Sequence, residues 1–257
     1  MNSIHPTAII DSAARIAPNV EIGPYCVIGP EVRIGSGSVL KSHVNLDGNT
    51  EIGEECTFYP FCSIGTKTQD LKYKGGSPGV KIGSGTVIRE YVTVSAATYD
   101  GDFTTVGDRC LLMAYSHVAH DCVVEDEVIM ANCATLAGHI HVEQKAIIGG
   151  LTGVHQFVRL GGMSIIGGCS KVIKDVPPYM MADGHPVEVR GLNSIGLKRR
   201  GVSSDHRRVL KEVYKILYRQ GLTTRDAVGK IRDEVEFIPE VVHILKFLEK
   251  SERGVTK

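Results

Sequence analysis

Between residues 106 and 176, an aliphatic side chain recurs at every sixth position of the sequence. The repeated residues are Val106, Leu112, Val118, Val124, Met130, Leu136, Val142, Ile148, Val154, Leu160, Ile166 and Val172. Neither an α-helix nor an ordinary amphipathic strand keeps a period of six. A fixed hexapeptide period is instead typical of a β-helix, in which each repeat forms one short strand and a corner. The period therefore predicts a mainly β fold, a β-helix whose triangular coils each contain three repeats.

The same period begins at Ile4 and continues to Ile64, after which it is interrupted twice. The first interruption, residues 66–79, reads TKTQDLKYKGGSPG, and the second, residues 99–104, reads YDGDFT. Insertions into a repeat architecture form loops on one face, which is often the binding face. Gln69, Asp70 and Lys72 in the first loop form a polar group that packing does not require.

Two kinds of small residue occupy fixed places in the repeat. Glycine often follows the aliphatic residue directly, and we expect it to supply a positive φ at the corner. These glycines are Gly23, Gly29, Gly35, Gly53, Gly65, Gly83, Gly107, Gly149, Gly161 and Gly167. Five of the seven cysteines lie four positions after a repeat aliphatic, namely Cys26, Cys56, Cys62, Cys110 and Cys122. No CxxC pair occurs, so we expect these cysteines to pack as small apolar residues.

The dipeptide Pro177–Pro178 ends the repeat, because proline removes a donor from the strand ladder. We assign residues 1–178 to the β-helix and residues 179–257 to a linker and a small C-terminal α-helical domain. The linker is expected from Tyr179 to Asn193. The residues suited to cap or begin the helices are Ser203 or Ser204, Thr224 and Pro239.

The composition of the chain argues against several partners and cellular locations. The formal net charge is zero, which argues against general binding to nucleic acid or a membrane surface. No apolar run approaches the roughly 20 residues of a membrane span. The first seven residues contain no charged or apolar segment typical of a signal peptide. We therefore expect a cytoplasmic protein without stable membrane insertion.

Spacing in the repeat suggests a cluster of histidines. Residues eighteen positions apart should stack in neighbouring coils, about 4.8 Å from one another. His120, His139 and His155 each follow a repeat aliphatic, and those three aliphatics are eighteen apart. We therefore expect the three histidines on one face, with His117 at the adjoining corner. This face is the candidate active site.

Two chemistries suit such a face. Imidazole binds zinc, iron or cobalt, but the sequence offers no carboxylate–histidine set that would close a metal site, and no metal is expected. A neutral imidazole also serves as a general base toward a hydroxyl group. The Gly138 amide could then stabilise an oxyanion, and Asp121 could orient His120, although neighbours on a strand point in opposite directions. Lys198, Arg199 and Arg200 are suited to hold a phosphate, or form a solvated basic turn.

Several motifs together resemble one family. They are QDLKY (69–73), LLMAYSHVAHDC (111–122), ATLAGH (134–139), GVHQF (153–157), GGCS (167–170), DVPPY (175–179) and GLKRRG (196–201). They resemble the UDP-N-acetylglucosamine O-acyltransferases of lipid A biosynthesis over essentially the whole chain. The resemblance implies a left-handed β-helix that forms a homotrimer with active sites between subunits. It also implies transfer of an (R)-3-hydroxyacyl group from acyl carrier protein to the 3-hydroxyl of UDP-GlcNAc, without a cofactor.

The resemblance also implies roles for individual residues. His120 is the expected general base and the Gly138 amide the expected oxyanion donor. Gly168 resembles the position that limits the length of the acyl chain in the family. The residues expected to position the sugar nucleotide are Asp70, Lys72, His117, His139 and Gln156, with His155 beside them, while Asn193, Arg199 and Arg200 are expected to meet the uridine and the phosphates.

The chain departs from the family pattern at two places. SAAT at residues 95–98 replaces a basic run associated with carrier-protein contacts, and Ile195 replaces a glutamate associated with a nucleotide contact. Three alternatives remain. An N-acyltransferase of amino-sugar nucleotides would share the fold, but usually has an additional N-terminal domain, whereas the repeat here begins at Ile4. The others are a metal enzyme like the γ-class carbonic anhydrases and a non-catalytic scaffold.

Overall fold

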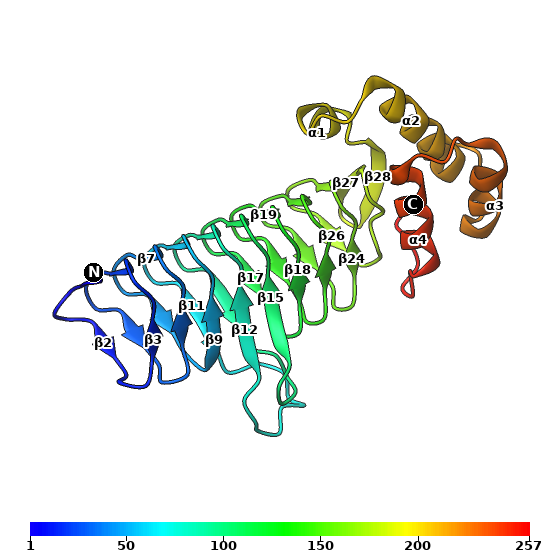
Figure 1. The fold of residues 1–257 in the computed structure, drawn as a ribbon. Helices are drawn as coiled ribbons and strands as arrows, with labels where there is room; N and C mark the ends of the chain where they lie inside the picture. The colour runs from blue at the N-terminus through cyan, green and yellow to red at the C-terminus, as the bar shows by residue number, and fades with distance from the viewer.

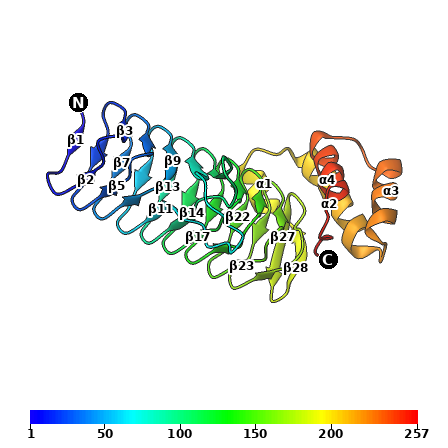
Figure 2. The same ribbon diagram turned by 90° about the horizontal axis from the view of Figure 1, so that it is seen from below.

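The computed structural model describes residues 1–257. The chain forms a long triangular prism with the N-terminus at one end and the helices at the other (Figures 1 and 2). Three parallel sheets of eleven, nine and eight strands form its sides, here called the first, second and third sheets. The coil is left-handed, as the resemblance implied. The predicted β-helix of hexapeptide repeats is confirmed.

The chain visits the three sheets in turn, so every third strand belongs to the same sheet until the last coil. The first sheet contains β1 (Ser3–Ile4), β4 (Glu21–Ile22), β7 (Val39–Leu40), β10 (Thr57–Phe58), β13 (Val87–Ile88), β16 (Leu111–Leu112), β19 (Ile129–Met130), β22 (Ile147–Ile148), β25 (Ile165–Ile166), β27 (Met180–Gly184) and β28 (Val187–Leu192). The second sheet contains β2 (Ile9–Ile10), β5 (Val27–Ile28), β8 (Asn45–Leu46), β11 (Ser63–Thr66), β14 (Thr93–Ser95), β17 (His117–Val118), β20 (Thr135–Leu136), β23 (Gly153–Val154) and β26 (Lys171–Val172). The third sheet contains β3 (Arg15–Ile16), β6 (Arg33–Ile34), β9 (Asn49–Ile52), β12 (Gly79–Ile82), β15 (Phe103–Val106), β18 (Val123–Val124), β21 (His141–Val142) and β24 (Arg159–Leu160).

The repeated aliphatic residues fill the inside of the prism. Leu112, Val118 and Val124 are fully or almost fully buried, and the residues eighteen positions later are in register with them. The five cysteines of the repeat are buried and unpaired, which confirms their packing role. The first coil is less covered, because Ile4 and Ile9 are 45% and 67% exposed.

Three corners separate the sheets. We call the turn from the first to the second sheet the first corner, from the second to the third sheet the second corner, and from the third back to the first sheet the third corner. Most turns contain one residue with a positive φ, and eighteen such residues are not glycine. Asp121 and His139 are two of them.

The expected role of the glycines that follow the repeat aliphatics is wrong. Of the ten that the sequence suggested, only Gly65 has a positive φ. These glycines instead allow close approach between coils. A Cβ atom at Gly53 would lie 2.7 Å from the amide nitrogen of Ser84, and a Cβ atom at Gly23 would lie 2.6 Å from the carbonyl oxygen of Lys41.

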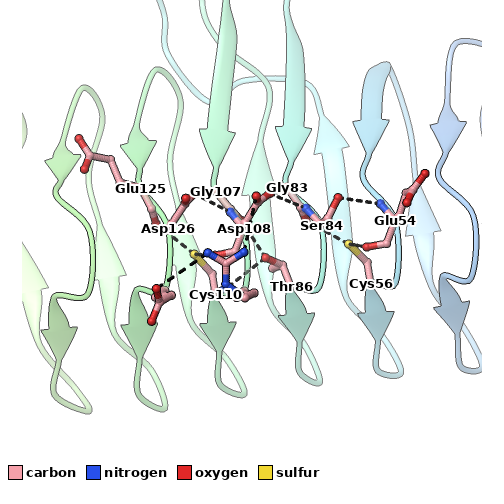
Figure 3. Close-up of polar contacts among 12 residues, drawn as sticks. Glu54, Cys56, Gly83, Ser84, Thr86, Gly107, Asp108, Cys110, Glu125 and Asp126 are labelled. Carbon is pink, nitrogen blue, oxygen red and sulfur yellow. Dashed lines mark hydrogen bonds and ion pairs between the residues drawn. The ribbon is translucent and has the colours of Figure 1, made fainter. Parts of the chain in front are cut away.

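The third corner is stabilised by a ladder of side chains that runs along the prism (Figure 3). Asp126 accepts a hydrogen bond from the backbone N–H of Asp108, and Asp108 accepts one from the N–H of Ser84. The Ser84 hydroxyl in turn accepts one from the N–H of Glu54. A side-chain oxygen of each coil therefore accepts a hydrogen bond from a corner N–H of the preceding coil. The backbone hydrogen bonds between the strands do not use this N–H.

The C-terminal part begins with a hairpin rather than an extended linker. Residues 179–193, for which the sequence suggested a linker, contain the antiparallel strands β27 and β28, and β27 extends the first sheet. Four helices follow: α1 (Ser194–Arg199), α2 (Ser204–Arg219), α3 (Thr224–Glu234) and α4 (Pro239–Glu249). Ser203 caps α2 as expected, whereas Thr223 rather than Thr224 caps α3. None of these helices has the length and apolar character to cross a membrane.

One chain of hydrogen bonds ties the last helix to the prism. His243 on α4 lies 2.8 Å from the Tyr179 hydroxyl through Nδ1 and 2.8 Å from Glu143 Oε2 through Nε2. The Glu143 carboxylate also accepts hydrogen bonds from the Gly162 N–H and from Arg159. The helical domain is therefore attached to the β-helix through a buried carboxylate.

Candidate active site

Both loops emerge from the second corner. The first joins β11 to β12 and the second joins β14 to β15, and both connect the second sheet to the third. Figure 1 shows them projecting from the prism beside β12 and β15. The turns of the next coils at this corner carry His120 and His139. Insertions and histidines therefore gather along one edge of the molecule.

The histidines occupy this edge rather than a flat face, which corrects the expected arrangement. His120 stacks on Gly138 and Gln156 in the next two coils, whereas His139 stacks between Asp121 and Phe157. The His120 and His139 rings meet edge to face with centroids 5.2 Å apart, and His139 stacks on Phe157 at 4.7 Å. The preceding aliphatics are equally spaced, but the three histidines follow them by different numbers of residues. For this reason the spacing did not predict which residues each histidine stacks on.

Asp121 and His120 converge although they are neighbours in the sequence. Asp121 Oδ2 lies 2.7 Å from His120 Nδ1. Adjacent side chains point in opposite directions only along a strand. Asp121 instead lies in a corner with a φ of 60°, which turns its side chain back toward His120. Such a pair is suited to general-base chemistry, because a hydrogen bond at Nδ1 leaves Nε2 as the proton acceptor.

Thr98 supports this pair and was missed by the sequence analysis. Its N–H donates to Asp121 Oδ1 at 2.9 Å, and its hydroxyl lies 3.1 Å from His120 Nδ1. The Asp121 N–H donates to the hydroxyl of Thr104 at 2.9 Å. Burial alone would raise the pKa of Asp121, but the hydrogen bonds from Thr98 and His120 and the nearby His139 hold it below its usual range. The SAAT segment that ends in Thr98 is buried, so it supports the site from within.

Gly138 faces the other side of the His120 ring. A Cβ atom at Gly138 would lie 2.6 Å from His120 Nε2, so only glycine leaves room for the imidazole. The Gly138 N–H donates to no group of the chain. An unused amide beside a potential base is the arrangement expected of an oxyanion donor.

The remaining predicted residues of this edge are more peripheral. His117, on β17, lies 2.7 Å from the Thr93 hydroxyl, and burial followed by the influence of His120 lowers its pKa. His155 is exposed, and its Nδ1 lies 3.2 Å from the carbonyl oxygen of Gln156. His117 lies one coil before Gly138, and His155 lies one coil after it.

The first loop brings Asp70 to the histidines. Asp70 Oδ2 is 3.9 Å from His120 Nδ1, and Asp70 Oδ1 accepts a hydrogen bond from the Lys72 N–H at 2.9 Å. The side chains of Gln69 and Lys72 are exposed at the surface of the loop. One expectation is thereby corrected: a carboxylate–histidine set does exist, because donor atoms of Asp70, His120 and His139 lie within 4.8 Å of one another.

Three further predicted groups lie elsewhere in the chain. Asn193 caps α1 through its side chain and donates to the carbonyl oxygen of Met163. Arg200 forms a 2.5 Å ion pair with Glu127 at the third corner, whereas Gly168 lies at the first corner. Arg199 is exposed on the last turn of α1. A single chain therefore places Arg200 and Gly168 on corners other than the one that carries His120.

A β-helix of hexapeptide repeats with a histidine–carboxylate pair on one edge defines the class of hexapeptide transferases. The family model for bacterial transferase hexapeptides matches residues 3–36 and 103–138. The model for domain 2 of UDP-N-acetylglucosamine O-acyltransferase matches residues 175–256.

Relatives identify the family more closely. The acyl-[acyl-carrier-protein]–UDP-N-acetylglucosamine O-acyltransferase of Thermodesulfovibrio yellowstonii is 52% identical, with 100% of both chains covered. The solved UDP-N-acetylglucosamine O-acyltransferase of Moraxella catarrhalis is 42% identical, with a TM-score of 0.95 and 99% of both chains covered. The corresponding acyltransferase of Bacteroides fragilis is 39% identical, with a TM-score of 0.96 and coverage of 99% and 100%. The chain belongs to the UDP-N-acetylglucosamine O-acyltransferase family.

Proposed function

We propose that this enzyme transfers an (R)-3-hydroxyacyl chain from acyl carrier protein to the 3-hydroxyl of UDP-GlcNAc, the first step of lipid A biosynthesis. The name of the Thermodesulfovibrio yellowstonii relative gives O-acylation of UDP-N-acetylglucosamine from an acyl carrier protein, and the chain matches that relative over its full length. The observation that carries the mechanism is the His120–Asp121 pair beneath the free amide of Gly138.

His120 acts as the general base. Its Nε2 takes the proton of the sugar 3-hydroxyl while the hydroxyl oxygen attacks the thioester carbonyl. The carbonyl oxygen becomes an oxyanion, which the Gly138 N–H stabilises. The C–S bond then breaks, and the carrier thiolate receives the proton from His120. Asp121 holds the required tautomer and stabilises the imidazolium that forms between the two steps.

The positions of the other predicted residues support a homotrimer with shared active sites. His120 lies at the second corner, Arg200 at the third and Gly168 at the first, so one chain does not gather them. Packing copies side by side brings different corners together. Asp70, Lys72, His117, His139 and Gln156 of one subunit would then position the sugar, with Gln69 and His155 beside them. Asn193, Arg199 and Arg200 of a neighbour would meet the uridine and the phosphates.

Gly168 limits the acyl chain in this proposal. A Cβ atom at Gly168 would meet only the Gly150 backbone, at 3.2 Å from its carbonyl oxygen, and the φ of Gly168 is not positive. A larger side chain therefore requires only a small shift of the Gly150 backbone and extends from the first corner. Gly168→Met is expected to shift the preferred donor to a shorter acyl chain. Turnover with carrier proteins of graded chain length measures this shift, and an unchanged ranking would remove Gly168 from this role.

The decisive experiment is a mass-spectrometric turnover assay on the purified protein. It offers UDP-GlcNAc or its 3-amino analogue together with 3-hydroxyacyl carrier proteins of graded length. His120→Ala is expected to reduce turnover by about 10²–10⁴-fold, the usual contribution of a general base. His141→Ala is the matched control, because His141 also pairs with a carboxylate, Glu125, but lies outside the His120 cluster.

Each result has a clear meaning. Acylated UDP-GlcNAc from wild type and from the His141 variant, but not from folded His120→Ala, supports the reaction and the base. Product formed only with the 3-amino analogue would assign the enzyme to N-acylation. Wild-type turnover in His120→Ala would refute the proposed base.

A further inference from the structure

We propose that Asp70, His120 and His139 bind a divalent transition-metal ion such as Zn²⁺, and that the bound ion blocks acyl transfer. The blocking effect rests on the proposed function, whereas the binding site does not. The ion would inhibit the enzyme and would not assist the reaction. It would occupy His120, the group that acyl transfer needs free as a base.

The distances favour a compact metal site. One donor atom from each of the three residues lies within 4.8 Å of the others. Asp121 adds a second carboxylate, because its Oδ2 lies 2.7 Å from His120 Nδ1 and 3.5 Å from His139 Nε2. Zn²⁺ bonds of about 2.0–2.2 Å place neighbouring ligand atoms about 3.4 Å apart in a tetrahedral site. The 3.9 Å separation of Asp70 Oδ2 from His120 Nδ1 exceeds this value only slightly.

The charge of the cluster also favours a cation. Within 4.0 Å, the side-chain carboxylates of Asp70 and Asp121 have histidines as their only ionic partners, with no lysine or arginine. Lys72 meets Asp70 through its backbone N–H and not through its ammonium group. Two carboxylates therefore converge on imidazoles without a fixed positive charge. A metal ion would supply that charge.

The elements that carry the ligands suit closure around an ion. His120, Asp121 and His139 are fixed by the coils, which provide a rigid half of the site. Asp70 belongs to an inserted loop, and loops adjust more readily than the elements they connect. A small movement of the loop toward His120 would bring the Asp70 carboxylate into bonding distance of an ion held by the histidines.

The ligand set selects the kind of ion. Imidazole favours zinc, cobalt, nickel and copper, whereas magnesium and calcium prefer sites made of oxygen ligands. An ion at His120 Nδ1 would displace the proton that Asp121 accepts and place a positive charge beside the ring. Such an imidazole takes up a proton poorly, so the metal form should not catalyse acyl transfer.

The test begins with binding. Co²⁺ is titrated into metal-free protein while its visible ligand-field absorbance is followed, and Zn²⁺ binding is measured by calorimetry. One ion per chain is expected, and Mg²⁺ should not compete. Asp70→Asn and His139→Asn should each weaken Co²⁺ binding at least about tenfold, since changes even to outer groups of metal sites typically cost 10–100-fold. Asparagine at position 139 is chosen because it tolerates the positive φ of 60° found there.

His141→Asn is the matched control, because this His pairs with Glu125 at 2.7 Å outside the cluster. The control should bind Co²⁺ like wild type. Absence of stoichiometric binding to wild type would overturn the proposal, as would unchanged binding in both the Asp70 and His139 variants.

A second measurement addresses inhibition. The Zn²⁺ concentration that halves wild-type turnover should match the dissociation constant of the site, and a chelator should restore turnover. Full turnover with the site occupied would overturn the blocking effect. If the metal-free enzyme makes no acylated sugar nucleotide, the proposed function fails, while the cobalt absorbance still reports whether the site exists.

Discussion

At the scale of single residues, the site depends on a turn that directs two neighbouring side chains to one place. The positive φ of Asp121 lets its carboxylate reach the His120 ring, and Thr98 fixes the carboxylate from the preceding coil. Gly138 then leaves space on the opposite side of the ring. The proposed base, its orienting group and the proposed oxyanion donor therefore come from adjoining turns of one corner.

Asp121→Asn should reduce kcat by about 10²-fold or more with little change in KM, because the amide removes the charge and presents an N–H to His120. The ring would then keep its proton on Nε2 and lose its function as a base. Steady-state kinetics with UDP-GlcNAc measure the effect. Asp126→Asn is the control, because Asp126 accepts an equivalent backbone hydrogen bond at the third corner. Equal losses in both variants would indicate damage to the coil rather than to catalysis.

At the scale of elements, the C-terminal helices depend on one buried carboxylate of the prism. Burial alone would raise the pKa of Glu143, but hydrogen bonds from His243 and Gly162 and the charge of Arg159 hold it below its usual 4.5. A carboxyl group with a lowered pKa in the folded state stabilises that state above its ordinary pKa. The stabilisation is lost as the pH falls through the lower, folded-state value.

Glu143→Gln should therefore lower the free energy of unfolding at pH 7 by about 1–3 kcal/mol, the cost of disturbing buried hydrogen bonds. The free energy of unfolding of the variant should also fall less than that of wild type as the pH drops below 4.5. Denaturant unfolding at a series of pH values measures both effects. Glu236→Gln, at an exposed position, should retain the wild-type profile. An unchanged acid profile in Glu143→Gln would show that this contact does not control acid stability.

At the scale of the whole molecule, the prism separates groups that the proposed reaction must unite. Inactive His120→Ala and Arg200→Ala subunits should therefore regain activity when they are unfolded, mixed in equal amounts and refolded together. In a trimer whose sites each take His120 from one subunit and Arg200 from the next, about one quarter of the sites are complete. Turnover and the molar mass by light scattering check this result. No recovery in a mixed trimer would place both residues in the same subunit's site.

The sequence predicted the coil because a period of six has few structural solutions, and every repeat contributes the same signal. Its local motifs named His120 and Gly138 as candidate site residues, and the structure brings these two side by side. It did not predict the contact of Asp70 with His120, because that contact depends on the path of an inserted loop. Nor did it predict Thr98, whose backbone N–H acts on Asp121, or the β27–β28 hairpin, whose pairing is set by the end of the first sheet.

The uncovered first coil has a consequence for how the prism comes apart. In a stacked repeat, each unit is stabilised mainly by its neighbours, so a terminal unit with one neighbour is the weakest. The hairpin and the chain end near Val255 close the far end, whereas Ile4 and Ile9 remain exposed at the near end. Thermal fraying therefore starts at the N-terminus and proceeds coil by coil along the prism, toward the coils that carry His120. The same open strands offer a template on which a second prism can stack end to end.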